Sequence, residues 1–208
     1  MADYQTDEEQ IARLKTWWDE NGLMMVTAVV LSISAFVGWR WYDDYRTEAI
    51  AQASDLYQDF LTAEGEARTT IVQTIEREAS ATSYHALMLL QQVQQDIEAG
   101  NYQDAESLLR QVIEVAPEQI LVDLASLRLA RVLQQLDRSD DALRTLATVR
   151  GEGYRSQVAE LKGDIHIARS ERSLAHEAYS AALTDLGDGV QRPLLEMKVA
   201  DTADADDS

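Results

Sequence analysis

Residues 100–117 read GNYQDAESLLRQVIEVAP, and the order of small and large residues in this stretch decides the fold. The small Ala105 stands four positions before the large apolar Leu109, and Pro117 closes the stretch. Two antiparallel helices need a small residue where their axes come closest, and a larger apolar residue one turn later to fill the groove. The stretch is therefore typical of a tightly packed helix pair.

The same order of residues recurs twice further along the chain. The corresponding positions are Gly100, Tyr102, Ala105 and Leu109 in the first repeat, Ala130, Ala142, Leu146 and Val149 in the second, and Gly163, Ala175, Tyr179 and Ala182 in the third. The alanines Ala105, Ala142 and Ala175 are separated by 37 and 33 residues, which brackets the tetratricopeptide period of about 34 residues. One helix pair cannot bury both of its faces, so neighbouring pairs stack into a solenoid. The sequence therefore predicts an all-α protein with a tetratricopeptide-like α-solenoid.

An irregular helical bundle is the alternative fold. The tryptophan and the first tyrosine of the repeat pattern are missing throughout, the pattern's glycine appears only as Gly163, and its proline only as Pro117. Composition favours helices in either fold, because prolines and glycines are few and good helix formers are plentiful. The leucines expected in the core are Leu89, Leu108, Leu109, Leu129, Leu133 and Leu146.

A second decisive stretch is the charge-free run of residues 23–39, LMMVTAVVLSISAFVGW. Its 17 residues reach the lower length limit for a membrane span. Aromatic residues flank the run on both sides: Trp17, Trp18, Trp39, Trp41 and Tyr42. Trp18 and Trp39 are 21 residues apart, which is ~31 Å along a helix and matches the thickness of a hydrocarbon core. Because indole rings prefer the membrane–water boundary, we expect a transmembrane helix over residues 23–42 with these aromatic side chains at its two interfaces.

A cleaved signal peptide is the competing interpretation of this run. It would need a basic start and small residues at the cleavage point. The first twenty residues instead carry six acids against Arg13 and Lys15, and the run leads into WRWYDDY. The segment is therefore expected to remain as an anchor. Its orientation is left open by the charges, because Arg13 and Lys15 on one side are balanced by Arg40 and Arg46 on the other.

The chain is expected to divide into four segments. These are an acidic N-terminal stub over residues 1–22, the transmembrane helix over residues 23–42, the tetratricopeptide-like domain over residues 43–200, and a disordered acidic tail over residues 201–208, DTADADDS. The membrane helix should continue beyond Tyr42 without a linker, since little breaks a helix before Gly65. A second amphipathic helix is expected from Glu66 to Glu78.

Charge and composition exclude several classes of protein. The formal net charge is −19 and the chain has three lysines, whereas a nucleic-acid-binding protein needs clustered Lys and Arg. The acidity fits either a basic partner or a solubilising surface. The chain has no cysteine and no HExxH, GxSxG or GxxxxGK motif. His166 falls at a repeat position that usually holds an aromatic residue, so it is expected to pack or to lie on a helix surface. We expect a protein that is not an enzyme and uses no cofactor or metal.

Three short motifs carry a resemblance to a known family. They are LRLARVL at Leu127–Leu133, LKGDI at Leu161–Ile165, and Ala178-Tyr179 followed by Ala182-Leu183. With the acidic start and the single span, they make the chain similar to the YfgM-type ancillary subunits of the bacterial SecYEG translocon, from its aromatic-rich start to about Leu186. The third repeat has Ser170-Glu171 where that family often has Gly-Asp, which leaves the geometry of this turn open.

The resemblance implies a location and a set of partners. The protein would lie in the bacterial inner membrane, with a cytoplasmic N-terminus and a periplasmic C-terminal domain. It would associate with SecYEG and with a periplasmic chaperone of PpiD type, and would help exported unfolded proteins to reach periplasmic chaperones. Two alternatives remain open: a homo-oligomeric membrane-anchored scaffold for envelope or secretion-apparatus assembly, and a domain that faces the cytoplasm and recruits a cytosolic partner.

The predicted partner-binding site is the concave face of the solenoid, which the first helix of each pair lines. The repeat register places five polar residues on this face: Gln94, Arg131, Gln134, Glu160 and Asp164. Polar side chains between apolar ones would suit extended or partly folded segments. The same residues fit an ordinary solvated helix surface equally well.

Overall fold

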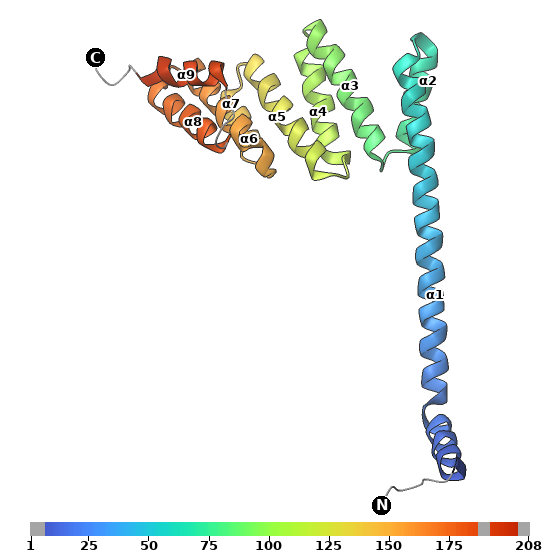
Figure 1. Ribbon diagram of the computed structural model, residues 1–208. Helices are drawn as coiled ribbons and strands as arrows, with labels where there is room; N and C mark the ends of the chain where they lie inside the picture. The colour runs from blue at the N-terminus through green and yellow to red at the C-terminus, as the bar shows by residue number, and fades with distance from the viewer. Residues whose placement is uncertain (1–6, 187–191, 204–208) are drawn as a thin grey trace, which may run out of the picture. The chain divides into compact units, whose positions relative to one another are not determined.

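The computed structural model describes residues 7–186 and 192–203, and within these ranges the regular structure is helical. The elements are α1 Asp7–Thr62, α2 Gly65–Glu78, α3 Ser83–Ala99, α4 Tyr102–Val115, α5 Gln119–Gln135, α6 Ser139–Leu146, the 3₁₀ helix η1 Glu152–Tyr154, α7 Arg155–Ala168, α8 Arg172–Asp185 and α9 Pro193–Ala203 (Figure 1). The predicted all-α class is confirmed. The chain forms two compact units, Met1–Ala51 and Gln52–Ser208.

The first unit contains most of α1 and the charge-free run. This helix is long and apolar enough to cross a membrane, and the large apolar side chains from Leu23 to Trp39 are exposed on its surface. The hydroxyl groups of Thr27 and Ser32 donate to the carbonyl oxygens of Leu23 and Ala28, at 2.7 and 2.8 Å. Because these hydroxyls are satisfied within the helix, the run presents an almost wholly apolar surface to its surroundings.

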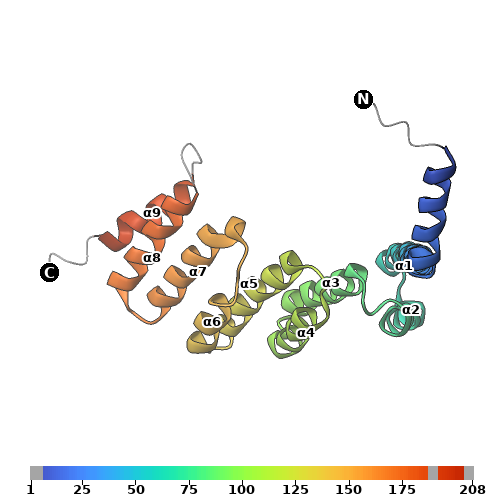
Figure 2. The ribbon, with the colours of Figure 1, turned by 90° about the horizontal axis from the view of Figure 1, so that it is seen from below.

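The second unit is a stack of antiparallel helix pairs. Helices α3 and α4, α5 and α6, and α7 and α8 form the pairs, and each helix also packs on the next in chain order. Figure 2 shows α3 to α8 side by side in this order, with α9 against α8. Helix α2 begins at Gly65, one residue before the predicted start, and ends at Glu78 as predicted. The arrangement is the α-solenoid expected from the repeats.

The anchoring alanines lie where the helices come closest. Ala105, Ala142 and Ala175 are all fully buried. In the third repeat Gly163 of α7 has the same role, because a Cβ atom on it would lie 2.3 Å from the Tyr179 ring of α8. The ring therefore packs directly against the α7 backbone, which only glycine permits.

The turns within the three pairs share one geometry. The turn residues Gly100, Asp137 and Ser170 have φ of 78°, 58° and 61°, and each stands five positions before an anchoring alanine. The residue after each one donates its N–H to a carbonyl five residues back, at 2.8 to 2.9 Å. This is the Schellman arrangement. The turn at Ser170 thus takes the same shape as the turn at Gly100, although its residue has a Cβ.

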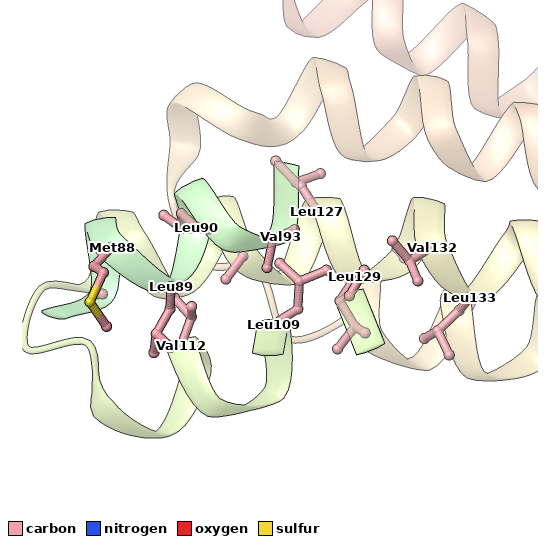
Figure 3. Close-up of a cluster of buried hydrophobic side chains, with 14 of the residues drawn as sticks. Met88, Leu89, Leu90, Val93, Leu109, Val112, Leu127, Leu129, Val132 and Leu133 are labelled. Carbon is pink, nitrogen blue, oxygen red and sulfur yellow. The ribbon is translucent and has the colours of Figure 1, made fainter. Parts of the chain in front are cut away.

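Most of the buried apolar residues form one continuous core. It runs from Ala53 at the end of α1 to Ile165 of α7, and Figure 3 shows its centre, where α3, α4 and α5 meet. Of the leucines expected there, five are buried and Leu108 is partly buried: Leu89, Leu108, Leu109, Leu129, Leu133 and Leu146. A smaller cluster of Ala175, Tyr179, Ala182 and Leu195 joins α8 to α9.

A buried carboxylate holds the loop between α6 and η1. Asp123 of α5 is 1% exposed and accepts the backbone N–H of Arg150 at 3.1 Å, that of Gly151 at 2.8 Å and Nε2 of Gln119 at 2.9 Å. Burial alone would raise the pKa of Asp123, but these hydrogen bonds outweigh it and hold the pKa below its ordinary value. The carboxylate therefore stays charged and ties the second repeat to the third.

Helix α9 was not predicted as a separate element. It extends to Ala203, so the first three residues of the segment expected to be a tail are helical, with Thr202 buried. The rest of that segment, residues 204–208, lies outside the described residues, as does the start of the N-terminal stub, residues 1–6.

Candidate partner-binding surfaces

A groove of about 380 Å³ lies between α3, α4 and α5. Its walls combine apolar, aromatic and polar side chains: Gln94, Ile97, Tyr102, Arg128, Arg131, Val132 and Gln135. Two of the five predicted site residues, Gln94 and Arg131, are therefore in one place. Both are exposed, and the Gln94 amide donates to Glu98 at 2.7 Å.

The two arginines set the electrostatic character of this groove, which we call the α3–α5 groove. Arg128 and Arg131 are one helical turn apart on α5 and point into the same space. Neither forms an ion pair with any residue of ranges 7–186 and 192–203. Many other arginines of the domain do, for example Arg138 with Glu106 at 2.8 Å. The α3–α5 groove thus offers two guanidinium groups beside apolar surface in a chain of net charge −19.

Glu160 and Asp164 of α7 lie in a different environment, beneath the C-terminal helix. Lys198 of α9 approaches Glu160 at 3.0 Å and Asp164 at 2.6 Å. Arg192, just before α9, binds Glu160 at 2.8 Å, and the Tyr179 hydroxyl donates to Asp164 at 2.8 Å. Both carboxylates therefore have partners within the chain.

The charges under α9 stabilise one another. Burial favours the neutral amine of Lys198, but its hydrogen bonds to Asp164 and Glu160 outweigh this effect and raise its pKa. Burial, together with the bond to Asp164, also raises the pKa of Tyr179. Lys198 therefore stays charged and the Tyr179 hydroxyl stays protonated at neutral pH, and both bind the carboxylates of α7.

The fifth predicted residue, Gln134, is half-buried on α5 and does not line the α3–α5 groove. The three histidines make separate contacts. His85 Nδ1 lies 3.2 Å from the Ser80 carbonyl oxygen, His166 Nδ1 lies 2.7 Å from Glu171, and His176 Nδ1 lies 3.2 Å from Thr202 Oγ1. Within the described ranges no three His, Cys, Asp or Glu residues gather in a way that could hold a metal ion.

Comparisons with known proteins agree with this architecture. A family model described as a tetratricopeptide repeat-like domain matches residues 15–204. A protein of Haemophilus influenzae named ancillary SecYEG translocon subunit is 30% identical over 93% of this chain and 96% of its own length. The chain belongs to the family of ancillary SecYEG translocon subunits.

Two further relatives in this family also match almost the whole chain. The Escherichia coli protein of the same name is 29% identical over 96% of this chain and 98% of its own length. The Neisseria gonorrhoeae protein is 23% identical over the same shares of the two chains. No solved structure matches the chain significantly.

The aromatic residues predicted at the membrane interfaces all stand out from α1 in this family member. Trp17, Trp18, Trp39, Trp41 and Tyr42 are exposed. Trp41 stacks on Tyr45, with ring centroids 6.2 Å apart, and Phe36 lies 6.4 Å from Trp39. Exposed indoles on both sides of an apolar helix are typical of membrane-spanning segments, so the interfacial role of these residues stays a prediction.

Sequence reasoning missed several residues of the α3–α5 groove and of the contact between α7 and α9. Arg128 could have been found, because it stands three positions before Arg131 on a helix and must share its face. Nothing local in the sequence pointed to Arg192 or Lys198, since they meet Glu160 only through the docking of α9.

Proposed function

We propose that this protein is a non-enzymatic adaptor of the inner membrane that binds the SecYEG translocon and passes exported chains to a periplasmic chaperone of PpiD type. The names of the relatives support the association with SecYEG. The tetratricopeptide repeat-like domain supports a role in protein binding, and the exposed apolar run of α1 supports a membrane anchor. In this proposal the N-terminus is cytoplasmic and the repeat domain is periplasmic.

The strongest support comes from Arg128 and Arg131 in the α3–α5 groove, which form no ion pair with the part of the chain that the structure describes. A guanidinium group that has no carboxylate partner within ranges 7–186 and 192–203 can bind a carboxylate of another protein. Ile97, Tyr102 and Val132 supply apolar contact area beside it. We therefore assign this groove to a partner or client segment that carries both an acidic and an apolar side chain.

Because the span tethers the domain to the membrane, a modest affinity of the α3–α5 groove for its partner is sufficient for binding. A domain tethered to the membrane meets partners in the same membrane at a high effective concentration. A weak groove contact would then let exported segments bind and leave again, as transfer from a channel to a chaperone requires.

Purification of the tagged full-length chain in gentle detergent, with mass spectrometry of the proteins that accompany it, tests the proposal. We expect translocon subunits and a periplasmic chaperone in near-stoichiometric amounts. Recovery of the chain only as a homo-oligomer would support the scaffold alternative, and cytosolic partners would reverse the proposed topology.

The variant Arg128→Ala/Arg131→Ala tests the groove in the same assay. Its control is Arg77→Ala/Arg155→Ala, which removes the same charge from two exposed arginines outside the groove. Loss of a partner in the first variant but not in the second supports the assignment. If the domain is folded and both variants recover the partner proteins equally, the groove is not the binding site.

A further inference from the structure

The first turns of α1 differ in character from the charge-free run that follows them. Residues 9–20 contain three acids and two bases, which is too many charges for a hydrocarbon core. They also present four large apolar side chains to the surroundings. Ile11, Leu14, Trp17 and Trp18 are 66%, 67%, 45% and 52% exposed, so nothing within the described chain covers them.

These four side chains share one face of the helix. Ile11, Leu14 and Trp18 follow at steps of three and four residues, and Trp17 adjoins them, which makes an apolar stripe about a third of the way around the helix. Polar residues at steps of four, three and four form the opposite face: Glu9, Arg13, Thr16 and Glu20. The segment is amphipathic, whereas the run from Leu23 to Trp39 is apolar all round.

The helix also changes direction before the run begins. In Figures 1 and 2 the deepest blue turns of α1 leave the line of the remaining helix. This part of the chain contains one glycine, Gly22, and glycine weakens a helix locally. Gly22 is buried because the Trp18 indole lies against it, within 3.1 Å of where a Cβ atom would stand. The Asn21 amide donates to the Trp17 carbonyl oxygen at 3.0 Å.

We propose that residues 9–21 form an interfacial helix that lies along the membrane surface, with Ile11, Leu14, Trp17 and Trp18 inserted between the lipid headgroups. The inference rests on the membrane span of the proposed function. Its occupant is the bilayer, because the apolar face adjoins Leu23, where the spanning run begins. A helix with one apolar face and a charged opposite face is stable in this plane and nowhere deeper.

The charges indicate which lipids are needed. With three acids against two bases in residues 9–20, attraction to anionic headgroups contributes little. Burial of the apolar face is the driving force, so insertion should occur on phosphatidylcholine and should not depend on salt.

The cysteine-free chain allows a direct test, because any introduced cysteine is unique. Single variants of the full-length chain in phosphatidylcholine vesicles would carry an environment-sensitive fluorophore. Ile11→Cys and Leu14→Cys probe the apolar face, Glu9→Cys, Arg13→Cys and Thr16→Cys probe the polar face, and Val30→Cys reports on the span. We expect blue-shifted emission and several-fold stronger quenching by lipid-borne nitroxides at positions 11, 14 and 30 than at positions 9, 13 and 16.

A second variant weakens the insertion of residues 9–21 into the membrane surface without affecting the span. Adding Ile11→Glu to the Leu14→Cys chain should abolish the blue shift at position 14, while the same substitution should leave the signal at position 30 unchanged. A water-like signal at positions 11 and 14 with a lipid-like signal at position 30 would contradict the interfacial helix, while it would still support the membrane span. A blue shift that appears only after purified translocon is added also overturns it. A water-like signal at position 30 overturns the span, and with it the proposed anchoring.

Discussion

Replacing Gly163 by alanine should destabilise the repeat domain, although alanine is the better helix former. The new Cβ atom would lie 2.3, 2.4 and 2.8 Å from three atoms of the Tyr179 ring. The ring has little freedom to move, because Tyr179 is 3% exposed and its hydroxyl is bonded to Asp164. Lys198 lies over the ring, 5.3 Å from its centroid.

The expected magnitude follows from two opposing effects. Overpacking of a dense interior costs about 1–3 kcal/mol, and the restrained ring places Gly163→Ala at the upper end. The helix propensity of alanine offsets ~1 kcal/mol of this cost. The net loss in the free energy of unfolding is therefore about 2 kcal/mol, which lowers the Tm of a domain of this size by ~4–8 °C.

Thermal unfolding of the full-length chain in detergent, followed by circular dichroism, measures this change. Gly153→Ala is the control, since nothing lies within 4 Å of the new Cβ atom, and its Tm should hardly move. In the Tyr179→Ala background the ring is gone, so Gly163→Ala should raise Tm. The same loss of stability in both backgrounds would refute the argument from ring contact.

Three further predictions concern the buried carboxylate, one turn and the last helix. Asp123→Asn should lower the free energy of unfolding by ~1–3 kcal/mol at neutral pH, as the two loop N–H groups lose their charged acceptor. Because the pKa of Asp123 is depressed in the folded state, its stabilising effect is present above pH ~4 and is lost as the pH falls further. Urea midpoints should therefore fall more on acidification in the wild type than in Asp123→Asn, where the remaining fall comes from other carboxylates of lowered pKa such as Glu106. Ser170→Gly should raise Tm, since the left-handed conformation at φ 61° costs serine about 1 kcal/mol, and an unchanged or lower Tm would contradict this. Leu195→Ala should release α9 through loss of a fully buried side chain, and amide hydrogen exchange should then speed up in α9 but not in α3 to α5.

The turn at Ser170 shows how far sequence reasoning reaches. The anchoring alanines predicted the register of all three repeats, because tight helix packing demands a small residue at a regular spacing. Sequence alone left the conformation of this turn open, since Ser and Gly differ in their preference for positive φ. Packing of α7 on α8 imposes the left-handed conformation on serine, so the tertiary structure overrides the local preference.

The predicted site residues show what sequence reasoning could not predict. Helical periodicity placed Gln94 and Arg131 on the predicted binding face, and both side chains are exposed in the structure. It gave no sign that Glu160 and Asp164 would be engaged by Lys198, which is 38 and 34 residues away in the chain. Contacts between distant segments depend on how whole helices dock.

The sequence by itself determined the helical class, the apolar run with its flanking tryptophans and the register of the repeats. Each of these depends on residues within one or two helical turns, or on one spacing repeated along the chain. Only the tertiary structure decided which polar side chains remain unpaired, as Arg128 and Arg131 do in the described ranges, and which are neutralised beneath α9. That distinction depends on the partners that packing brings within hydrogen-bonding distance, and a local pattern carries no information about them.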